Sequence, residues 1–340
     1  MAHVHFMLHP DENWQSLEVA YDLVYGKRGS KNNQVEILLS WEFNNKYALR
    51  NHLYPFWLSI PAFILKFLGL DTNFLVVNSM YFMHCLLWTF GDYFFFYLVQ
   101  TLAGKRCAIL AQVVSFSNDD VFRFVSRVSS NGVEGSLVIA ALYYYTQVKP
   151  KLFDSNLMKM TFLITIAFIA RSSSLVPWIP LALFKITENL NFFVPILVAG
   201  ISVTVPMCII SILLDSYFYG VLTIPQVNFV KFNVVENISK YFGIQAPFFY
   251  INGLKHEYCN PMLVVGLFGL SLLTVKQVLG DLNHYNYNCK QAVIRPSKVP
   301  FIFIYSLTYI LVLSTLDHKE LRFYTPVIQL GCFAQGFVYE

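Results

Sequence analysis

The chain has 340 residues, of which 56% are hydrophobic and only 13% charged, and its mean hydropathy is +0.51. Soluble domains carry about 25% charged residues, so the composition excludes an ordinary soluble protein and predicts an all-α polytopic membrane protein. The net charge of +4 does not indicate a nucleic-acid partner, because the basic residues fall in short segments between apolar runs, where they set membrane orientation. The six cysteines show no CxxC pair and no histidine-flanked spacing, so neither a disulfide framework nor a metal site is predicted.

The first polar region, residues 9–52, is predicted to lie outside the membrane. It opens with Asp11 and Glu12 before apolar residues at helical spacing, which indicates an amphipathic helix along a membrane face. The apolar positions of this helix are Trp14, Leu17, Tyr21 and Val24. Around Trp41 to Tyr54, aromatic and charged side chains alternate, as is typical of a membrane interface or a wet cleft.

Apolar runs fill most of the remaining chain. They cover residues 53–69, 75–103, 107–117, 133–148, 157–170, 173–186, 192–214, 262–279, 300–316 and 324–339. We assign 75–103 as a crossing and 53–69 as interfacial. Several runs are shorter than the roughly 20 residues that a perpendicular span needs, so the number of spans stays open.

Basic residues between the runs predict which side each connection faces. They cluster at 105–106, 149–151, 185 and 276–298, and the positive-inside rule places these clusters in the cytosol. The acidic N-terminal region, the segment 117–131, the Arg171 turn and the long loop 215–261 then share the opposite, lumenal face. The glycosylation sequon Asn237-Ile238-Ser239 agrees with that side.

The hexapeptide HKELRF, residues 318–323, follows the apolar run 300–316 directly and belongs to the same face. If the helix continues through it, the spacing of four residues places His318 and Arg322 on one side of the helix. This arrangement predicts a phosphate-binding site. The alternative is an interfacial anchor, in which Lys319 and Arg322 reach out to the headgroups.

Several stretches, in this order and at this spacing, strongly resemble the dolichyl-phosphate-mannose-dependent mannosyltransferases of the endoplasmic reticulum. They include HPDENWQSLE (9–18), RSSSLVPWIP (171–180) and HKELRF. NFVKFNVVEN and YFG, within 228–243, most resemble the members that add the third mannose of the glycosylphosphatidylinositol (GPI) anchor. The resemblance implies a GT-C type transmembrane helix bundle with lumenal loops, as a single domain over 1–340. It also implies that the family's first helix and its C-terminal helices are missing from this chain.

The implied activity is an inverting α-1,2-mannosyltransferase in the membrane of the endoplasmic reticulum, with its active site in the lumen. It would move mannose from dolichyl phosphate mannose, a lipid-linked donor, to the GPI precursor glycolipid, without a metal or another cofactor. The sequence leaves protein partners open. Two alternatives remain: a sibling enzyme that adds the fourth GPI mannose or builds the lipid-linked N-glycan precursor, and a non-catalytic transport or lipid-handling protein. Asp92, inside the run 75–103, favours the second.

The resemblance also implies roles for particular side chains. Asp11 would be the base that takes the acceptor proton, with Glu12 as the neighbouring candidate; in a helix the two point about 100° apart. From the residues alone, capping of a helix is the better reading of Asp11. Arg171 fits equally well as a helix end at the headgroups. The expected donor-phosphate ligands are His318, Lys319, Arg322, Arg127 and Arg171, and the expected lining of the substrate cleft is Trp14, Gln15, Glu42 and Arg50.

Overall fold

The computed structural model describes residues 11–26, 39–119, 121–247, 249–250 and 300–338. Within these ranges the regular secondary structure is helical, with no strand, as the composition predicts. The expected apolar run 262–279 and the basic cluster 276–298 lie outside the described residues.

The α-helices of the described chain are α1 (Glu18–Tyr25), α2 (Leu53–Phe67), α3 (Asn73–Ala103), α4 (Lys105–Ser117), α5 (Ser130–Tyr145), α6 (Ser155–Ala170), α7 (Trp178–Glu188), α8 (Phe193–Ala199), α9 (Val205–Tyr219), α10 (Pro225–Val230), α13 (Pro300–Thr315) and α14 (Thr325–Val338). Short π-helical turns are η2 (Asn13–Leu17), η4 (Val121–Val125), η7 (Gly200–Thr204) and η8 (Lys231–Val235). Short 3-10 turns are η3 (Trp41–Phe43), η5 (Ser172–Leu175), η6 (Leu190–Phe192), η9 (Ile238–Phe242) and η11 (Leu321–Tyr324).

Two helices of the described chain are long and apolar enough to cross a membrane. The first is α3, with 31 residues and an 18-residue stretch of mean hydropathy 1.3; it coincides with the apolar run 75–103. The second runs from Leu190 to Tyr219 through η6, α8, η7 and α9, with 30 residues and an 18-residue stretch of mean hydropathy 2.5. At 1.5 Å per residue each spans about 45 Å, which exceeds the hydrocarbon core of a bilayer.

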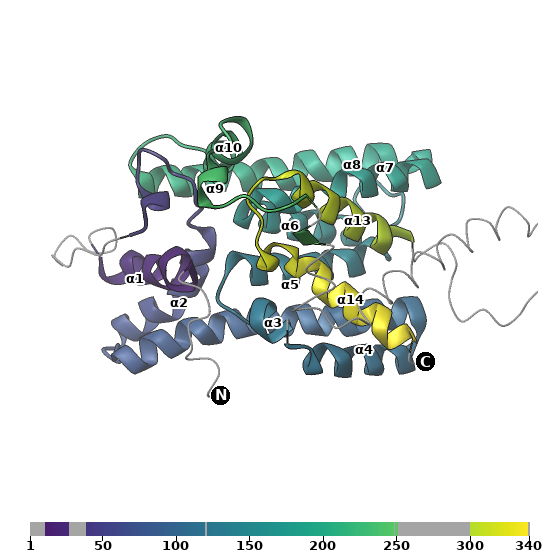
Figure 1. Cartoon of the computed structure of the whole chain (residues 1–340), viewed down its shortest axis with the longest axis horizontal. Coiled ribbons are helices and arrows are strands. Elements are labelled where there is room, and N and C mark those ends of the chain that lie inside the picture. The colour runs from purple at the N-terminus through teal and green to yellow at the C-terminus, as the bar shows by residue number, and fades with distance from the viewer. Residues whose placement is uncertain (1–10, 27–38, 120, 248, 251–299, 339–340) are drawn as a thin grey trace, which may run out of the picture.

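The helices form one bundle around α5 (Figure 1). In the view of Figure 1, α3 and α4 lie along the bottom and α7 to α9 along the top, with α5, α6, α13 and α14 between them. Because α5 packs against α3, α6 and α14, its residues are buried on all sides. Such a helix belongs to the interior of the bundle. Phe95, Ile139 and Tyr309 illustrate the continuous apolar core.

Small residues allow the closest helix contacts, as is usual between helices in membranes. A Cβ on Gly91 of α3 would lie 2.8 Å from the Cα of Ser136 in α5. A Cβ on Gly336 of α14 would lie 2.6 Å from the backbone nitrogen of Ala111 in α4. Any side chain at these two positions would push the helices apart.

Asp92 of α3 takes part in this helix packing. Its Oδ1 accepts a hydrogen bond of 2.9 Å from Nε2 of Gln329 in α14. The side chain therefore ties α3 to α14, and this contact explains a carboxylate in an apolar run without a transport pathway.

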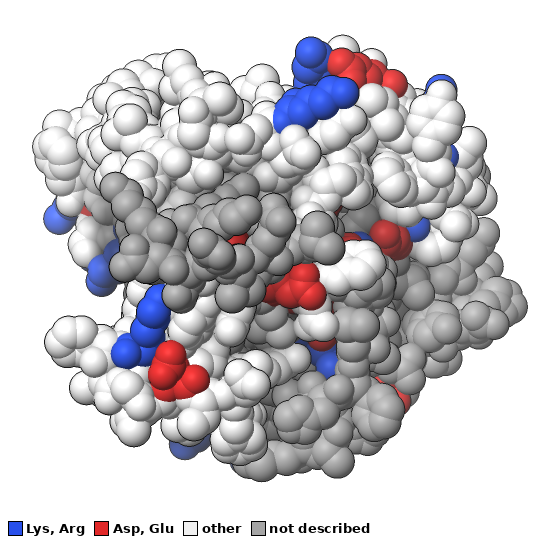
Figure 2. Space-filling model, turned by 90° about the vertical axis from the view of Figure 1, so that its left-hand side faces the viewer, with Lys and Arg blue, Asp and Glu red and all other residues white. Residues whose placement is uncertain are grey.

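Residues 39–52 and 220–230 lie towards the same end of the bundle (Figure 1). In Figure 1 this is the left side, where α1, α2 and α10 lie. Figure 2 faces that end and shows charged side chains in small separate groups on a mostly uncharged surface. Since α9 continues to Tyr219, the first residues of the expected loop 215–261 are helical, and α10, η8 and η9 form its next part.

The glycine contact between α3 and α5 gives a test. Gly91→Val should lower the thermal unfolding temperature of the detergent-solubilised protein, because overpacking typically costs about 1–3 kcal/mol. Gly200→Ala is the matched control, since a Cβ at Gly200 would meet nothing within 4 Å. Equal unfolding temperatures for the two variants would contradict the close approach of these helices.

Candidate functional site

The site centres on Arg322, which joins the two ends of the described chain. Its Nη2 lies 2.6 Å from Oδ2 of Asp11, a residue 311 positions earlier in the sequence. Its Nε also binds Glu320, whose other oxygen is 2.9 Å from Nε2 of His318. The predicted acid and the hexapeptide therefore meet in one place. The ion-paired side chains of Arg322 and Asp11 are 16% and 23% exposed, so the pair lies at the edge of the packed interior.

Helix α13 does not continue through the hexapeptide, and this part of the prediction was wrong. Helix α13 ends at Thr315, and a bend and an extended segment precede η11. Glu320 has extended backbone angles (φ −132°, ψ 148°), which interrupt any helix at this point. His318 and Arg322 still lie together, because both bind the carboxylate of Glu320.

Lys319 occupies a different environment from the other cations of the hexapeptide. It is only 4% exposed, and its Nζ donates a hydrogen bond of 3.2 Å to the backbone carbonyl of Gln245. A buried ammonium group needs such acceptors. Lys319 thus anchors the segment that covers it.

Glu12 and Arg127 form a second pair beside Asp11. Nη1 of Arg127 is 3.8 Å from Oε2 of Glu12, and Glu12 is only 4% exposed. Burial raises the pKa of Glu12 to about 7, although the positive fields of Arg127 and Arg322 act in the opposite direction. Near neutral pH this carboxyl group is therefore divided between its charged and uncharged forms.

Arg171 follows the last residue of α6 and turns back onto the first turn of α5. Its Nε is 2.9 Å from Oε2 of Glu134, which is fully buried, and its Nη1 binds the side chain of Asn131. Glu134 also accepts a hydrogen bond of 2.8 Å from the hydroxyl of Tyr309. The Asn131 amide in turn donates to the carbonyl of Arg322 at 2.7 Å. Asn131 thus connects the two arginines.

The expected cleft residues form a third group. Glu42 accepts from Nε2 of Gln15 at 2.7 Å and from Nη2 of Arg50 at 2.8 Å. These three side chains come from η2, η3 and the segment before α2, so they fasten the N-terminal helix to the following loop. Trp14 differs, because it is 52% exposed.

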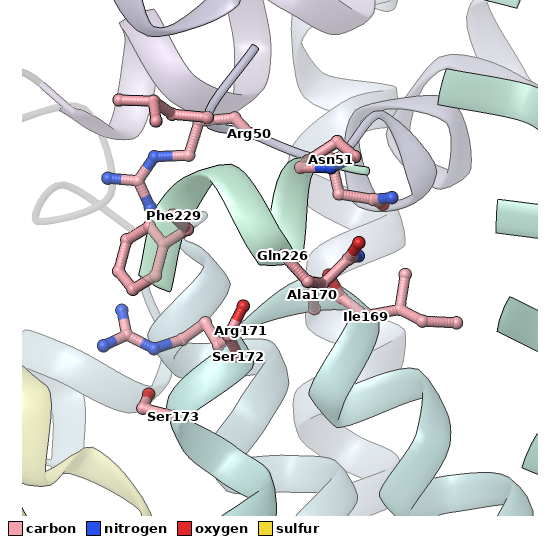
Figure 3. Close-up of a pocket in the computed structure, with 11 residues that line it drawn as sticks. Arg50, Asn51, Ile169, Ala170, Arg171, Ser172, Ser173, Gln226 and Phe229 are labelled. Carbon is pink, nitrogen blue, oxygen red and sulfur yellow. The ribbon is translucent and has the colours of Figure 1, made fainter. Parts of the chain in front are cut away.

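A pocket lies between Arg50 and Arg171. Figure 3 shows their guanidinium groups on opposite sides of the Phe229 ring, with the Arg50 carbon 5.8 Å from the ring centre. The remaining lining residues are Leu49, Asn51, Ile169, Ala170, Ser172, Ser173, Pro225 and Gln226. Two guanidinium groups with hydroxyl and amide groups nearby are suited to an anion with several oxygens, such as a phosphate.

A cluster of buried polar side chains holds the backbone of Arg50 and the next two residues in place. Asp215 of α9 is fully buried and accepts from the backbone and Nδ1 of His52, at 2.8 and 3.0 Å, and from the amide of Asn51. The hydroxyl of Tyr219 donates to the carbonyl of Arg50 at 2.7 Å. The end of the long helix 190–219 therefore holds the segment that carries Arg50.

Sequence reasoning missed Glu134, Asn131 and Gln245. A lone carboxylate in the apolar run 133–148 was a signal for Glu134, because such a residue needs a buried partner. Asn131 and Gln245 offered no comparable signal, since their roles depend on contacts across the fold. The described residues hold no group of three or more His, Cys, Asp and Glu side chains that could bind a metal ion.

The pair of Arg171 and Glu134 gives a stability test. Glu134→Ala should lower the free energy of unfolding by about 3–5 kcal/mol, because it leaves a buried arginine without its counter-charge. The control is Glu188→Ala, which removes the partner of Lys185 in a pair with 20% and 30% exposed side chains; such a loss costs about 0–1 kcal/mol. Thermal unfolding in detergent measures both. A similar effect of the two changes would show that the Arg171 pair contributes little.

The raised pKa of Glu12 gives a pH test. Between pH 4.5 and about 7 the native state binds more protons at Glu12 than the unfolded state, so stability falls as pH rises through this range. Glu12→Gln should match the wild type near pH 4.5 and be the more stable protein at pH 8. Unfolding temperatures recorded across this range check the prediction. Parallel curves for the two proteins would contradict it.

Comparisons with known proteins identify the family of the chain. The sequence model of the Alg9-like mannosyltransferase family matches residues 1–340. GPI alpha-1,2-mannosyltransferase 3 of Bos taurus is 28% identical over 327 residues, covering 94% of this chain and 52% of that protein. GPI mannosyltransferase 3 of Drosophila melanogaster is 29% identical, with 94% and 50% covered.

The fold resembles that of ArnT from Cupriavidus metallidurans in its structure bound to undecaprenyl phosphate. The TM-score is 0.58 at 12% identity, over 97% of this chain and 55% of ArnT. This likeness shows a shared fold, and together with the family match it confirms the predicted GT-C type helix bundle. The chain spans about half the length of the curated relatives it matches. The resemblance drawn from the motifs is confirmed: this chain belongs to the Alg9-like mannosyltransferase family.

Proposed function

We propose that this chain carries the active site of an inverting α-1,2-mannosyltransferase that adds the third mannose of the GPI anchor. The donor is dolichyl phosphate mannose and the acceptor is the GPI precursor, both held by their lipid tails. The enzyme works in the membrane of the endoplasmic reticulum, with its site on the lumenal side. The observation that carries the proposal is the ion pair of Asp11 with Arg322, in which the candidate base lies beside a cation of the family motif.

The phosphate of the donor fits the pocket between Arg50 and Arg171. Within the hexapeptide, Lys319 is buried against Gln245 and His318 is paired with Glu320. The two arginines of the pocket are also paired, with Glu42 and Glu134, but both line the pocket from opposite sides of Phe229 (Figure 3). Fixed guanidinium groups stabilise the charge that grows on a departing phosphate. The structure of ArnT has undecaprenyl phosphate bound, and that ligand is also a lipid phosphate.

The chemistry needs one base. Asp11 takes the proton of the acceptor hydroxyl while the oxygen of that hydroxyl bonds to the anomeric carbon of mannose. The bond from that carbon to the phosphate oxygen breaks, and the lipid phosphate leaves with the electron pair. Attack from the face opposite the phosphate inverts the anomeric centre. The phosphate leaves as an anion, so no general acid is required, unlike in inverting hydrolysis, where two carboxyl groups act.

Asp11→Asn should lower the rate of mannose transfer by at least about 10²-fold, because a positioned base contributes about 10²–10⁴-fold. The rate is measured in microsomes with radiolabelled dolichyl phosphate mannose. Glu12→Gln is the matched control: it also changes an acid to its amide, next to Asp11, and should retain most of the activity. Turnover near wild type in Asp11→Asn would exclude the role of Asp11. A larger loss in Glu12→Gln would transfer the role to Glu12.

Complementation of cells that lack the third GPI mannose decides the acceptor. The two-mannose precursor accumulates in such cells, and expression of this chain should remove it, with the added residue sensitive to an α1,2-specific mannosidase. Persistence of that precursor, with relief of a different glycan defect, would reassign the chain to a sibling enzyme of the same family.

A further inference from the structure

The segment 237–245, which we name the strap, lies against the start of the hexapeptide. Its backbone meets the hexapeptide region in three hydrogen bonds. The amide of Gln245 donates to the carbonyl of Asp317 at 3.0 Å, and the carbonyls of Gly243 and Gln245 bind Nδ1 of His318 and Nζ of Lys319, at 3.3 and 3.2 Å. The strap thus contacts three consecutive residues immediately before Glu320.

A side-chain bond fastens the first residue of the strap. Nδ2 of Asn237 donates to Oδ2 of Asp317 at 2.7 Å. Asn237 has left-handed backbone angles (φ 48°, ψ 39°), a conformation that asparagine tolerates better than most residues. Gly243 has φ +125°, a region that essentially only glycine occupies. The conformation of the strap therefore requires an asparagine-like and a glycine residue at its two bends.

The same asparagine belongs to the sequon Asn237-Ile238-Ser239. Its amide nitrogen, the atom that a glycan would occupy, is the donor to Asp317. Ser239 is only 7% exposed. A glycan on Asn237 would replace one of the two hydrogens on this nitrogen, and its bulk would have to fit beside Asp317 and the end of α13. The side chain of Asn237 therefore makes a hydrogen bond within the protein.

Resting on the function proposed above, we propose that Asn237 is a positioning residue that pins the strap to Asp317 and is not a glycosylation site. Through the strap it holds His318 and Lys319, and through Glu320 it sets the position of Arg322. Arg322 in turn contacts Asp11, the candidate base. A shift of the strap thus reaches the reacting groups through a chain of direct contacts, although Asn237 itself touches no reacting atom.

Three variants distinguish an effect of the hydrogen bond between Asn237 and Asp317 from an effect of the glycosylation sequon. Asn237→Asp removes the amide donor and sets a carboxylate opposite Asp317. Ser239→Ala destroys the sequon but keeps the bond between Asn237 and Asp317. The exchange Asn237→Asp with Asp317→Asn restores one hydrogen bond with donor and acceptor reversed. Glu236→Gln is the control for a neighbouring charge, because Glu236 forms an exposed pair with Lys231.

Mannose transfer in microsomes is the first readout. We expect Asn237→Asp to lower kcat by about 10–10²-fold, since a misplacement of about 1 Å costs up to about 10²-fold, with little change in KM for the donor. The exchange variant should recover most of the loss, and Ser239→Ala and Glu236→Gln should match the wild type. Equal losses in Asn237→Asp and Ser239→Ala, or no recovery in the exchange variant, would overturn the proposal.

Two readouts do not depend on activity. Trypsin cleavage after Lys240, within the strap, should be faster in Asn237→Asp than in the wild type or Ser239→Ala. Endoglycosidase treatment should leave the mobility of the wild-type chain unchanged at this sequon, so that wild type and Ser239→Ala migrate alike. Equal cleavage in all variants, or a glycan on Asn237, would overturn the proposal. A chain that transfers no mannose but gives the expected cleavage pattern would reject only the proposed function.

Discussion

The ion pair between Asp11 and Arg322 is the contact on which the candidate site depends. It joins two residues that are 311 positions apart in the sequence, with the helix bundle between them. Arg322 also binds Glu320 through its side chain and Asn131 through its carbonyl. In a partly buried setting such bonds are stronger than in water. These contacts hold the segments that carry Asp11, Glu320 and Asn131 in place around Arg322.

A common arrangement extends beyond this pair. Four arginines of the site each have a carboxylate partner. The pairs are Arg322 with Asp11, Arg171 with Glu134, Arg127 with Glu12 and Arg50 with Glu42. Pairing is what allows charges to be withdrawn from water. An anion that entered this site would meet arginines that are already oriented, and it would share them with the carboxylates.

The sequence predicted the helical fold, the long apolar helix α3 and the meeting of Asp11 with the hexapeptide, because apolar runs and charge placement constrain these features strongly. It did not predict the path of residues 316–324. Helical spacing suggested one face for His318 and Arg322, whereas a bend and the carboxylate of Glu320 bring them together. Nor could it predict that Gln245 covers Lys319. Contacts between loops leave no periodic trace in a sequence, so only the fold reveals them.

The hydrogen bonds of Asp215 with residues 51–52 connect the pocket to the long apolar helix 190–219. The helix 190–219 ends in the fully buried cluster that holds the backbone beside Arg50. A helix longer than the hydrocarbon thickness adjusts by tilting, and any tilt of this one moves its terminal turn. Arg50 therefore stands on backbone that is fixed to the end of this helix, so a displacement of its terminal turn would also displace Arg50 and its side of the pocket.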